Sequence, residues 1–568
     1  MKKHTLRVLS MAIALTMTMT FALSGCGSSG NTTTTSSTES TTTEESTASE
    51  ESSDAEEAES TEETGDTETA DYSDVVINYG LTTAWDSLNP YGSSSGSTFQ
   101  HMVLDKLYDR LAYITEAAES VEPRAAESWE SSEDGMTATF HLDPDAKFHD
   151  GTPVTANDWV FTAYLITDPN FDFGMKSEFK FFEGTDDSGV RTGDTLGIEA
   201  TDDHTLVMTF KTPTPVEDWI MLHNKYFYVL PEHLLGDMDP AEVNASDIWD
   251  NPNDLGSGPC TYISELSGSQ LELGSFADYQ LGAPKFGKLV YTVISASNTV
   301  TSVMTGELDM FMQSSSIEDS LAAEDMGLPV QKSDLPTSIV AFLINNQNVS
   351  DKRIRQAMNL AIDKEMLIDQ NVEGQGVPSA TFIVPGSEYD AGIEWSRDVE
   401  KAKELLAEAG WDSSETLTMA VTSTRERMAA VIQQNLAEVG INIEILTVDL
   451  ATEFAGLQDG TYDLGICGST ATNYPLWMEG YYDYRNATYC QITDPSFAEY
   501  QEQIASEMDE TARKELVNEY QEFWYDEMPL VMLYHAYSFN VVSPRMSGVH
   551  QSDAGMLNEA VWNWEVTE

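Results

Sequence analysis

The chain has 568 residues, and its 96 Asp and Glu against 28 Lys and Arg give a formal net charge of −68. This length excludes a single small domain and predicts roughly three or four folded units, or two large lobes. Phosphate backbones and anionic membrane surfaces repel so acidic a chain, which argues against a nucleic-acid partner.

The N-terminus has the pattern of a targeting segment. A basic start (Lys2, Lys3 and Arg7) precedes an apolar run over residues 8–23, which is short for a membrane span of about 20 apolar residues. The run ends in Leu23-Ser24-Gly25-Cys26, which resembles the lipobox of bacterial lipoproteins. We therefore expect a signal peptide over residues 1–25 and a lipid on Cys26. An ordinary secretory peptide with an incidental Cys is the alternative.

Residues 26–70 form a low-complexity segment rich in Ser, Thr and Glu, with no aromatic residue, Lys or Arg. Such a segment cannot bury enough apolar surface to offset its chain entropy, so we expect it to be disordered. Between a lipid anchor and a folded body it would act as a spacer, and a tail without function is the alternative. No later stretch has the length of a membrane span, so the lipid would be the sole anchor.

From Asp71 onward, strand and helix patterns alternate. Residues 75–79 are rich in β-branched side chains and predict a strand. Residues 136–142 alternate strictly between polar and apolar, which predicts a half-buried strand. Thr155 is typical of a helix N-cap, with Asp158 at the third helical position.

The second half of the chain contains a β-α-β unit. Ser396 and Gly410 have the patterns of the start and the end of an amphipathic helix. A strand over residues 417–421, a helix over 425–439 and a strand over 441–445 follow. This crossover predicts parallel strands in an α/β lobe.

The spacing of the cysteines does not indicate a metal site. Besides Cys26 there are Cys260, Cys467 and Cys490, and none has CxxC or zinc-ligand spacing, so we predict no metal site and no cofactor. One disulfide is plausible in an exported protein, and Cys467 with Cys490 is the nearest pair. Buried free thiols are the alternative.

Short motifs along the body occur in the order found in one family. They are WDSLNP (85–90), LYDRL (107–111), PRAAESW (123–129), FHDGTPVTAND (148–158), GSGP (256–259), GELD (306–309), NNQ (345–347), DKRIRQAMNLAID (351–363) and KAKELLAEAGW (401–411). Together they resemble the family 5 solute-binding proteins of ABC importers, which include oligopeptide, dipeptide and nickel-chelate binders.

The resemblance implies an α/β fold: a two-lobed, periplasmic-binding-protein-like clamshell with three domains. Domain I would be discontinuous, and domain III would be the opposing lobe. The ligand would lie in the cleft, and the lobes would close over it. The implied boundaries are 71–95, 195–335 and 526–568 for domain I, 96–194 for domain II and 336–525 for domain III.

Within this family, His149 and Asp150 belong to a block that shapes a turn and caps a helix rather than binding ligand. The two residues are adjacent in sequence, unlike the i,i+4 histidines of a helical metal site. We therefore interpret this block as structural.

The resemblance also implies where ligand would bind. In peptide-binding members, a strand like residues 462–468 leads into a loop whose Asp holds the peptide α-ammonium. Here the matching position is Thr472, and basic residues that hold the peptide carboxylate in some members are missing, with Ile466 in the strand. Asn345 and Asn346 could bind ligand or support the hinge. The cleft candidates are Trp85, Ser94, Asn345, Asn346, Ser469, Thr472, Asn473, Tyr474 and Trp477.

The implied function is that of an extracytoplasmic, lipid-anchored binding protein that captures peptides and delivers them to ABC permease subunits in the membrane. The same role for another solute, such as an oligosaccharide or a chelate, is one alternative. A secreted hydrolase or a surface adhesin is the alternative of another class. The chain has no HExxH motif, and we predict no enzymatic activity.

The loop around Thr472 also makes a prediction about the ligand. A desolvated α-ammonium needs a carboxylate, and this loop has none. We therefore expect free di- and tripeptides to bind poorly, and capped or cyclic peptides or oligosaccharides to bind better.

Overall fold

The computed structural model describes residues 71–92, 97–114, 121–311, 317–470, 475, 489–549 and 560–567. All of them belong to one unit, Ala70–Glu568. The predicted signal peptide and tether, with Cys26, lie outside the described residues. The same holds for the cleft candidates Ser94, Thr472, Asn473, Tyr474 and Trp477.

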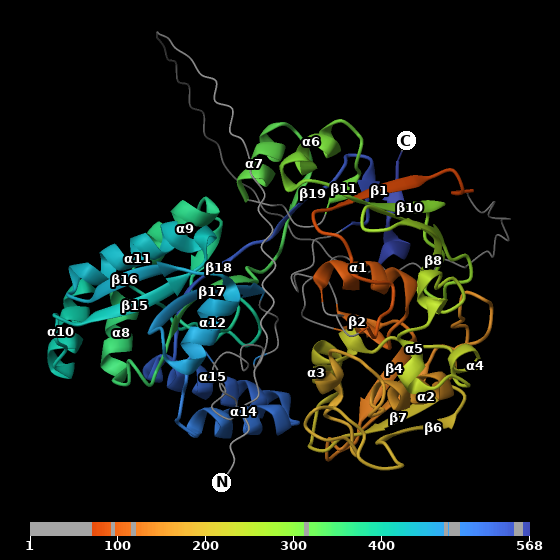
Figure 1. The fold of residues 1–568 in the computed structure, drawn as a ribbon, viewed down its shortest axis with the longest axis horizontal. Helices are drawn as coiled ribbons and strands as arrows, with labels where there is room; N and C mark the ends of the chain where they lie inside the picture. The colour runs from red at the N-terminus through yellow and green to blue at the C-terminus, as the bar shows by residue number, and fades with distance from the viewer. Residues whose placement is uncertain are drawn as a thin grey trace, which may run out of the picture. The chain divides into compact units, whose positions relative to one another are not determined.

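The first sheet has five strands (Figure 1). In order across the sheet they are β11 (Met310–Phe311), β1 (Val76–Leu81), β10 (Lys288–Val293), β9 (Gln270–Ser275) and β8 (Cys260–Leu266). The predicted strand over residues 75–79 is β1, which pairs in parallel with both β10 and β11. The helix α1 (Thr98–Leu107) contacts β8.

A second, antiparallel sheet has four strands: β4 (Ala126–Ser131), β5 (Thr137–Leu142), β7 (Thr205–Thr209) and β6 (Ile198–Asp202). The predicted alternation is confirmed in β5, where Phe140 is fully buried. Helices α2 (Ala156–Ile166) and α3 (Val216–Leu222) contact this sheet, and the predicted capping box of Thr155 and Asp158 is present at the start of α2. One hydrophobic core joins both sheets, and we call this part of the chain the first body.

The third sheet has six strands: β14 (Gly376–Pro378), β18 (Val531–Ala536), β13 (Ser338–Ile344), β17 (Leu464–Thr470), β15 (Thr416–Val421) and β16 (Asn442–Thr447). The predicted β-α-β unit is confirmed, because β15 and β16 pair in parallel and α11 (Glu426–Glu438) joins them. β17 is parallel to β15 and antiparallel to β13.

Both faces of this sheet are buried, because alternate residues of β13 belong to different cores. Phe342 packs with the core of α8 (Lys352–Ala361), α9 (Lys364–Val372), α10 (Val399–Ala409) and α11. Leu343 packs on the other face, with the core of α12 (Leu450–Asp459), α14 (Ser496–Ser506) and α15 (Glu510–Glu527). We call this part of the chain the second body. Near-continuous apolar strands are typical of a sheet covered on both faces.

The chain passes between the two bodies at two neighbouring segments. Strand β12 (Val330–Lys332) precedes the outward passage, and its antiparallel partner β19 (Phe539–Val541) follows the return. Helices α6 (Thr299–Met304) and α7 (Ile317–Asp325) pack in a small core beside them. The other described α-helices and strands are β2 (Ala112–Ile114), β3 (Val121–Pro123), α4 (Glu232–Leu235), α5 (Pro240–Val243), β20 (Met546–Ser547) and β21 (Glu565–Val566).

The pairing of the strands moves two of the expected domain boundaries. β18 lies inside the six-stranded sheet, so the return passage follows Ala536 and not residue 525. β6 and β7 pair with β5, so the four-stranded sheet extends to Thr209 and not to residue 194. Both shifts have one cause: these strands hydrogen-bond to partners far away in sequence.

Candidate ligand-binding site

One edge of the six-stranded sheet has the geometry of a ligand site. The parallel strands β15, β16 and β17 all end there, after Val421, Thr447 and Thr470. Ser338, where β13 begins, and Ala536, where β18 ends, lie at the same edge, beside the passages to the first body. Ligands of open α/β sheets bind outside the carboxyl ends of parallel strands.

Arg425 lies at this edge, between β15 and α11. Its guanidinium lies over Gly468 of β17: a Cβ atom at Gly468 would be 2.7 Å from Nη2 of Arg425. The side chain is half-buried. Within the described residues, its guanidinium makes no hydrogen bond or ion pair.

The positive charge of Arg425 acts on three neighbouring groups. Burial raises the pKa of Glu453 to about 7, and the Ile466 N–H and then Arg425 oppose this rise. Burial likewise raises the pKa of Tyr534 and of the Cys467 thiol to about 12, again against the effect of Arg425. The carboxylate of Glu453 accepts a hydrogen bond of 3.0 Å from the Ile466 N–H. This bond holds the Glu453 side chain against β17.

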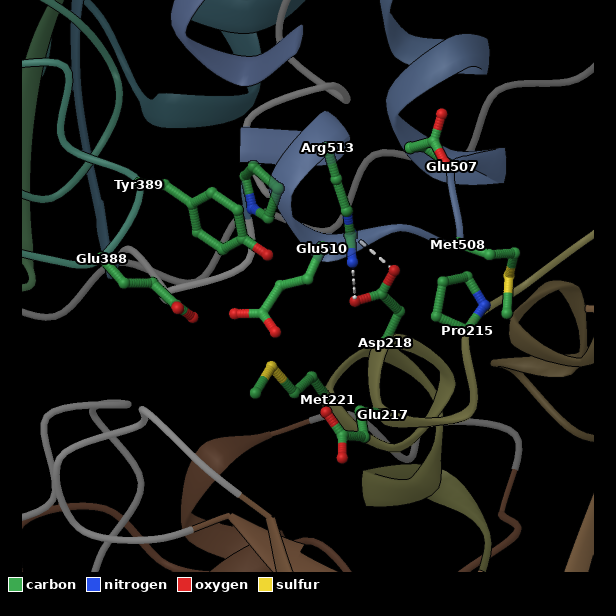
Figure 2. A pocket seen from close by; sticks show the side chains of 11 residues that line it. Pro215, Glu217, Asp218, Met221, Glu388, Tyr389, Glu507, Met508, Glu510 and Arg513 are labelled. Carbon is green, nitrogen blue, oxygen red and sulfur yellow. Dashed lines mark hydrogen bonds and ion pairs between the residues drawn. The ribbon is translucent and has the colours of Figure 1, made fainter. Parts of the chain in front are cut away.

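A cavity of about 340 Å³ lies where α3 of the first body meets α15 of the second (Figure 2). Pro475, the described residue of the loop after β17, lines it together with Tyr389. An ion pair between Asp218 and Arg513 crosses it. Its other charged lining residues are all acidic: Glu217, Glu388, Glu507 and Glu510.

The acidic residues of this cavity supply the negative charge that the loop around Thr472 does not have itself. They come from α3, from the segment before Tyr389, from the C-terminal end of α14 and from α15, so the fold brings negative charge to Pro475 from several parts of the sequence. Lys514 pairs with Glu388 and Glu510, which offsets part of that charge. The cavity remains net acidic and suits a cationic group.

The described cleft candidates do not share one site. Ser469 is half-buried at the edge where β17 ends. Trp85 belongs to the core of the first body, and its indole N–H donates to Glu265 Oε1 of β8 at 2.8 Å. Asn345 and Asn346 follow the other end of β13, and a seven-residue strand spans about 20 Å.

The side chains of both asparagines are hydrogen-bonded to backbone groups. The Asn345 amide donates to the Leu457 carbonyl at 2.8 Å, and its oxygen accepts from two backbone N–H groups. Asn346 donates to the carbonyls of Cys490 and Pro529. Of the two alternatives drawn from the sequence, structural support is the one that these contacts favour.

Of the two alternatives for Cys467 and Cys490, the structure has the free thiols and not the disulfide. Cys467 and Cys490 are buried free thiols that pack in the same core. Burial raises the pKa of each to about 12, which disfavours the thiolate that disulfide formation requires. Cys260 is also a buried free thiol.

His149 lies in the turn as interpreted from the sequence. Its ring is buried, and Nε2 lies 2.9 Å from the Gly258 carbonyl. In the described part of the chain, no group of three His, Cys, Asp or Glu side chains is arranged to hold a metal ion. No described helix is long and apolar enough to cross a membrane.

Sequence reasoning missed Arg425 and the acids of the cavity. Arg425 follows a predicted strand and opens a predicted helix, which is where parallel sheets bind ligands, so its position carried a signal. The acidic residues of the cavity gave no such signal in the sequence, because only the folding of the chain brings them close to Pro475.

The chain matches the sequence profile of the bacterial extracellular solute-binding proteins, family 5, over residues 120–488. It therefore belongs to this family. The periplasmic oligopeptide-binding protein OppA of Escherichia coli K12 is 27% identical over 463 residues, which cover 76% of this chain and 82% of OppA. Heme-binding protein A of Haemophilus influenzae is 23% identical over 481 residues, which cover 79% of this chain and 85% of that protein.

Solved structures share the fold. CtaP of Listeria monocytogenes, an ABC transporter substrate-binding protein, has a TM-score of 0.75 at 22% identity, covering 87% of this chain and 100% of its own. AppA of Bacillus subtilis, in complex with a nonapeptide, has a TM-score of 0.68 at 20% identity, covering 87% and 99%. The predicted family and its mixed α/β fold are confirmed. Proteins of this family bind solutes outside the cytoplasm for ABC transporters and are not enzymes.

Proposed function

We propose that this chain captures peptides outside the cytoplasm and delivers them to the permease of an ABC importer. The observation that carries the proposal is the cavity between α3 and α15, because groups from both bodies and from the loop after β17 line it. Relatives support a peptide as the solute: OppA is named for oligopeptides, and proteins of Brucella that are 28% identical over 406 residues are named as putative ABC transporter peptide-binding proteins.

Capture works through closure. A ligand that contacts both bodies favours the state in which they are together, by its differential affinity for that state. The two passages beside β12 and β19 serve as the hinge, since they are the short segments that join the bodies. The permease then distinguishes loaded from empty protein. The clamshell of three domains belongs to this proposal, with its boundaries after Thr209 and Ala536.

A lipid on Cys26 anchors the protein to the membrane, on the periplasmic side or the outer face, and the acidic segment up to residue 70 spaces the body from it. Cys26→Ala should release the protein from the membrane fraction or leave it unprocessed. A normally cleaved Cys26→Ala protein that stays in the membrane fraction would argue against the anchor.

A thermal-shift screen tests the function. We expect an equimolar library of random tetrapeptides to raise the unfolding temperature of the full-length protein, because a ligand present at 100 times its Kd stabilises the bound state by about 2.7 kcal/mol. Neutral oligosaccharides serve as the second arm. A shift with oligosaccharides alone would replace the peptide by another solute, and no shift with any compound would refute solute capture.

A further inference from the structure

The return passage between the two bodies is very short. β18 ends at Ala536 and β19 begins at Phe539, so Tyr537 and Ser538 alone join the six-stranded sheet to β19. The outward passage consists of residues 333–337, between β12 and β13. Any rotation of one body against the other must change the backbone torsion angles in these two passages.

Lys332 reaches across this hinge. It is the last residue of β12, a strand that packs through Val330 in the small core with Phe311 of β11, and so belongs with the first body. The Lys332 ammonium lies 3.6 Å from the centroid of the Tyr537 ring. It also donates a hydrogen bond of 3.2 Å to Oε1 of Gln375, the residue before β14 of the second body. A first-body side chain therefore contacts both the hinge and the second body.

Backbone hydrogen bonds hold the partners of Lys332 in place. The carbonyl of Gln375 accepts a hydrogen bond of 3.1 Å from the Tyr537 N–H, which keeps the tyrosine beside Gln375. The two passages are joined by two bonds of 2.9 Å: the Ser333 N–H donates to the Ser538 carbonyl, and the Ser538 N–H donates to the Ser333 hydroxyl. The position of the Tyr537 ring therefore depends on how the passages lie against each other.

The ammonium of Lys332 has no carboxylate partner within the described residues, in a chain with 96 acidic residues. Lys147 and Lys288 of the first body, in contrast, each pair with a carboxylate. An ammonium this close to the face of a tyrosine is attracted by the negative charge of the π-system. The charge of Lys332 is therefore directed at the hinge.

These contacts belong to an arrangement in which the bodies touch each other. The ion pair of Asp218 and Arg513 joins α3 to α15, and Leu222 of α3 packs against the core of α14 and α15. A rotation at Tyr537 changes the distances from Lys332 to its partners. An interaction that is made in one of two states shifts the equilibrium toward that state.

We propose that Lys332 is a hinge clasp, which favours closure of the two bodies by capping the Tyr537 ring. The inference rests on the proposed function, because closure is the step by which the solute is captured. Lys332 does not contact the solute in this proposal. It raises the fraction of molecules that are competent to bind, and so it raises the affinity for every solute by the same factor.

A double-mutant cycle tests the clasp, by calorimetric titration of the full-length protein with random tetrapeptides and with random hexapeptides. Lys332→Met keeps the apolar stem without the charge. We expect it to weaken the binding of both libraries about threefold, the equivalent of about 0.7 kcal/mol. Tyr537→Leu removes the ring, and Lys332→Met should have a smaller effect when it is added to this variant.

Three further variants make the cycle specific. Lys332→Arg keeps a cation over the ring and should bind like the wild type. Lys147→Met is the matched control, since Lys147 pairs with Asp278 at the surface of the first body, and it should leave the affinity unchanged. Tyr537→Phe keeps a ring and should preserve the full effect of Lys332→Met; this variant replaces Tyr537→Leu if that protein does not fold.

Unchanged affinity in Lys332→Met, or additive losses in the double variant, would overturn the inference and leave solute capture standing. Losses that differ between the two libraries would also overturn it, because a residue that acts through closure does not distinguish solutes. If neutral oligosaccharides bind and peptides do not, the same threefold loss with oligosaccharides would support the clasp while the choice of peptides falls. No binding of any compound would refute the proposed function, and the inference with it.

Discussion

Arg513 of α15 and Asp218 of α3 form a buried ion pair that joins the second body to the first. Nη1 donates to Oδ1 at 2.7 Å, Nη2 lies 2.5 Å from Oδ2, and the side chains are 7% and 10% exposed. Burial raises the pKa of Asp218, and Arg513 opposes that rise. The pair crosses the acidic cavity, so it links the contact between the bodies to the proposed ligand site (Figure 2).

Removing one partner of this pair should destabilise the chain. Asp218→Asn breaks the buried ion pair with Arg513, and breaking such a pair by removing one charge typically costs about 3–5 kcal/mol. Urea unfolding measures the loss. Lys514→Gln is the control, because Lys514 makes its ion pairs at the surface and such pairs contribute at most about 1 kcal/mol. Equal losses in the two variants would contradict the assignment of a buried linking pair.

Three buried histidines should make the protein sensitive to acid. Burial lowers the pKa of His101 and His149 to about 4 and that of His535 to about 3. The unfolded chain therefore binds protons near pH 6.5 that the folded chain does not, and stability falls as the pH drops from 6.5 toward 4. Urea unfolding across this range measures proton uptake. His149→Gln should reduce the uptake by about one proton.

Glu453 should have the opposite pH dependence. Its pKa in the folded chain, about 7, lies above the ordinary value of 4.5 mainly because the side chain is buried. The folded state therefore holds a proton that the unfolded chain loses, and stability falls as the pH rises from 4.5 to 7. Glu453→Gln keeps an acceptor for the Ile466 N–H and should raise stability at pH 8, by about 3 kcal/mol at most, with little effect at pH 4. A variant that is less stable than the wild type at pH 8 would show that the ionised carboxylate of Glu453 stabilises the fold, which would contradict this prediction.

The acidic cavity predicts a preference for a free amino end. Random tetrapeptides should bind about tenfold tighter than their N-acetylated forms at low salt, and the difference should shrink as salt screens the carboxylates. This reverses the expectation drawn from the loop around Thr472 alone, because the fold brings acids from α3 and α15 beside Pro475. Calorimetric titration decides the matter: equal or tighter binding of the acetylated peptides would restore the first expectation.

Local patterns in the sequence were sufficient for much of the fold. Strict alternation located β5, a Thr followed by Asp at the third helical position located the start of α2, and the β15-α11-β16 crossover predicted a parallel sheet. Each of these signals lies within a few residues along the chain. The family motifs extended them to the whole body.

Long-range pairing was beyond such signals. Nothing around Asp218 indicates Arg513, which is 295 residues away. The strand β18 has the composition of any buried strand, and only its partner β13 assigns it to the second body. Asn345 was an attractive ligand group in sequence because its commitment to the Leu457 carbonyl depends on the packing of α12.

A peptide that is held between the two bodies should draw them closer together. Small-angle scattering of the full-length protein, with and without the tetrapeptide library at saturation, tests it most directly. We expect a smaller radius of gyration with peptide than without it. An unchanged radius in a sample whose calorimetric titration shows full occupancy would contradict the account.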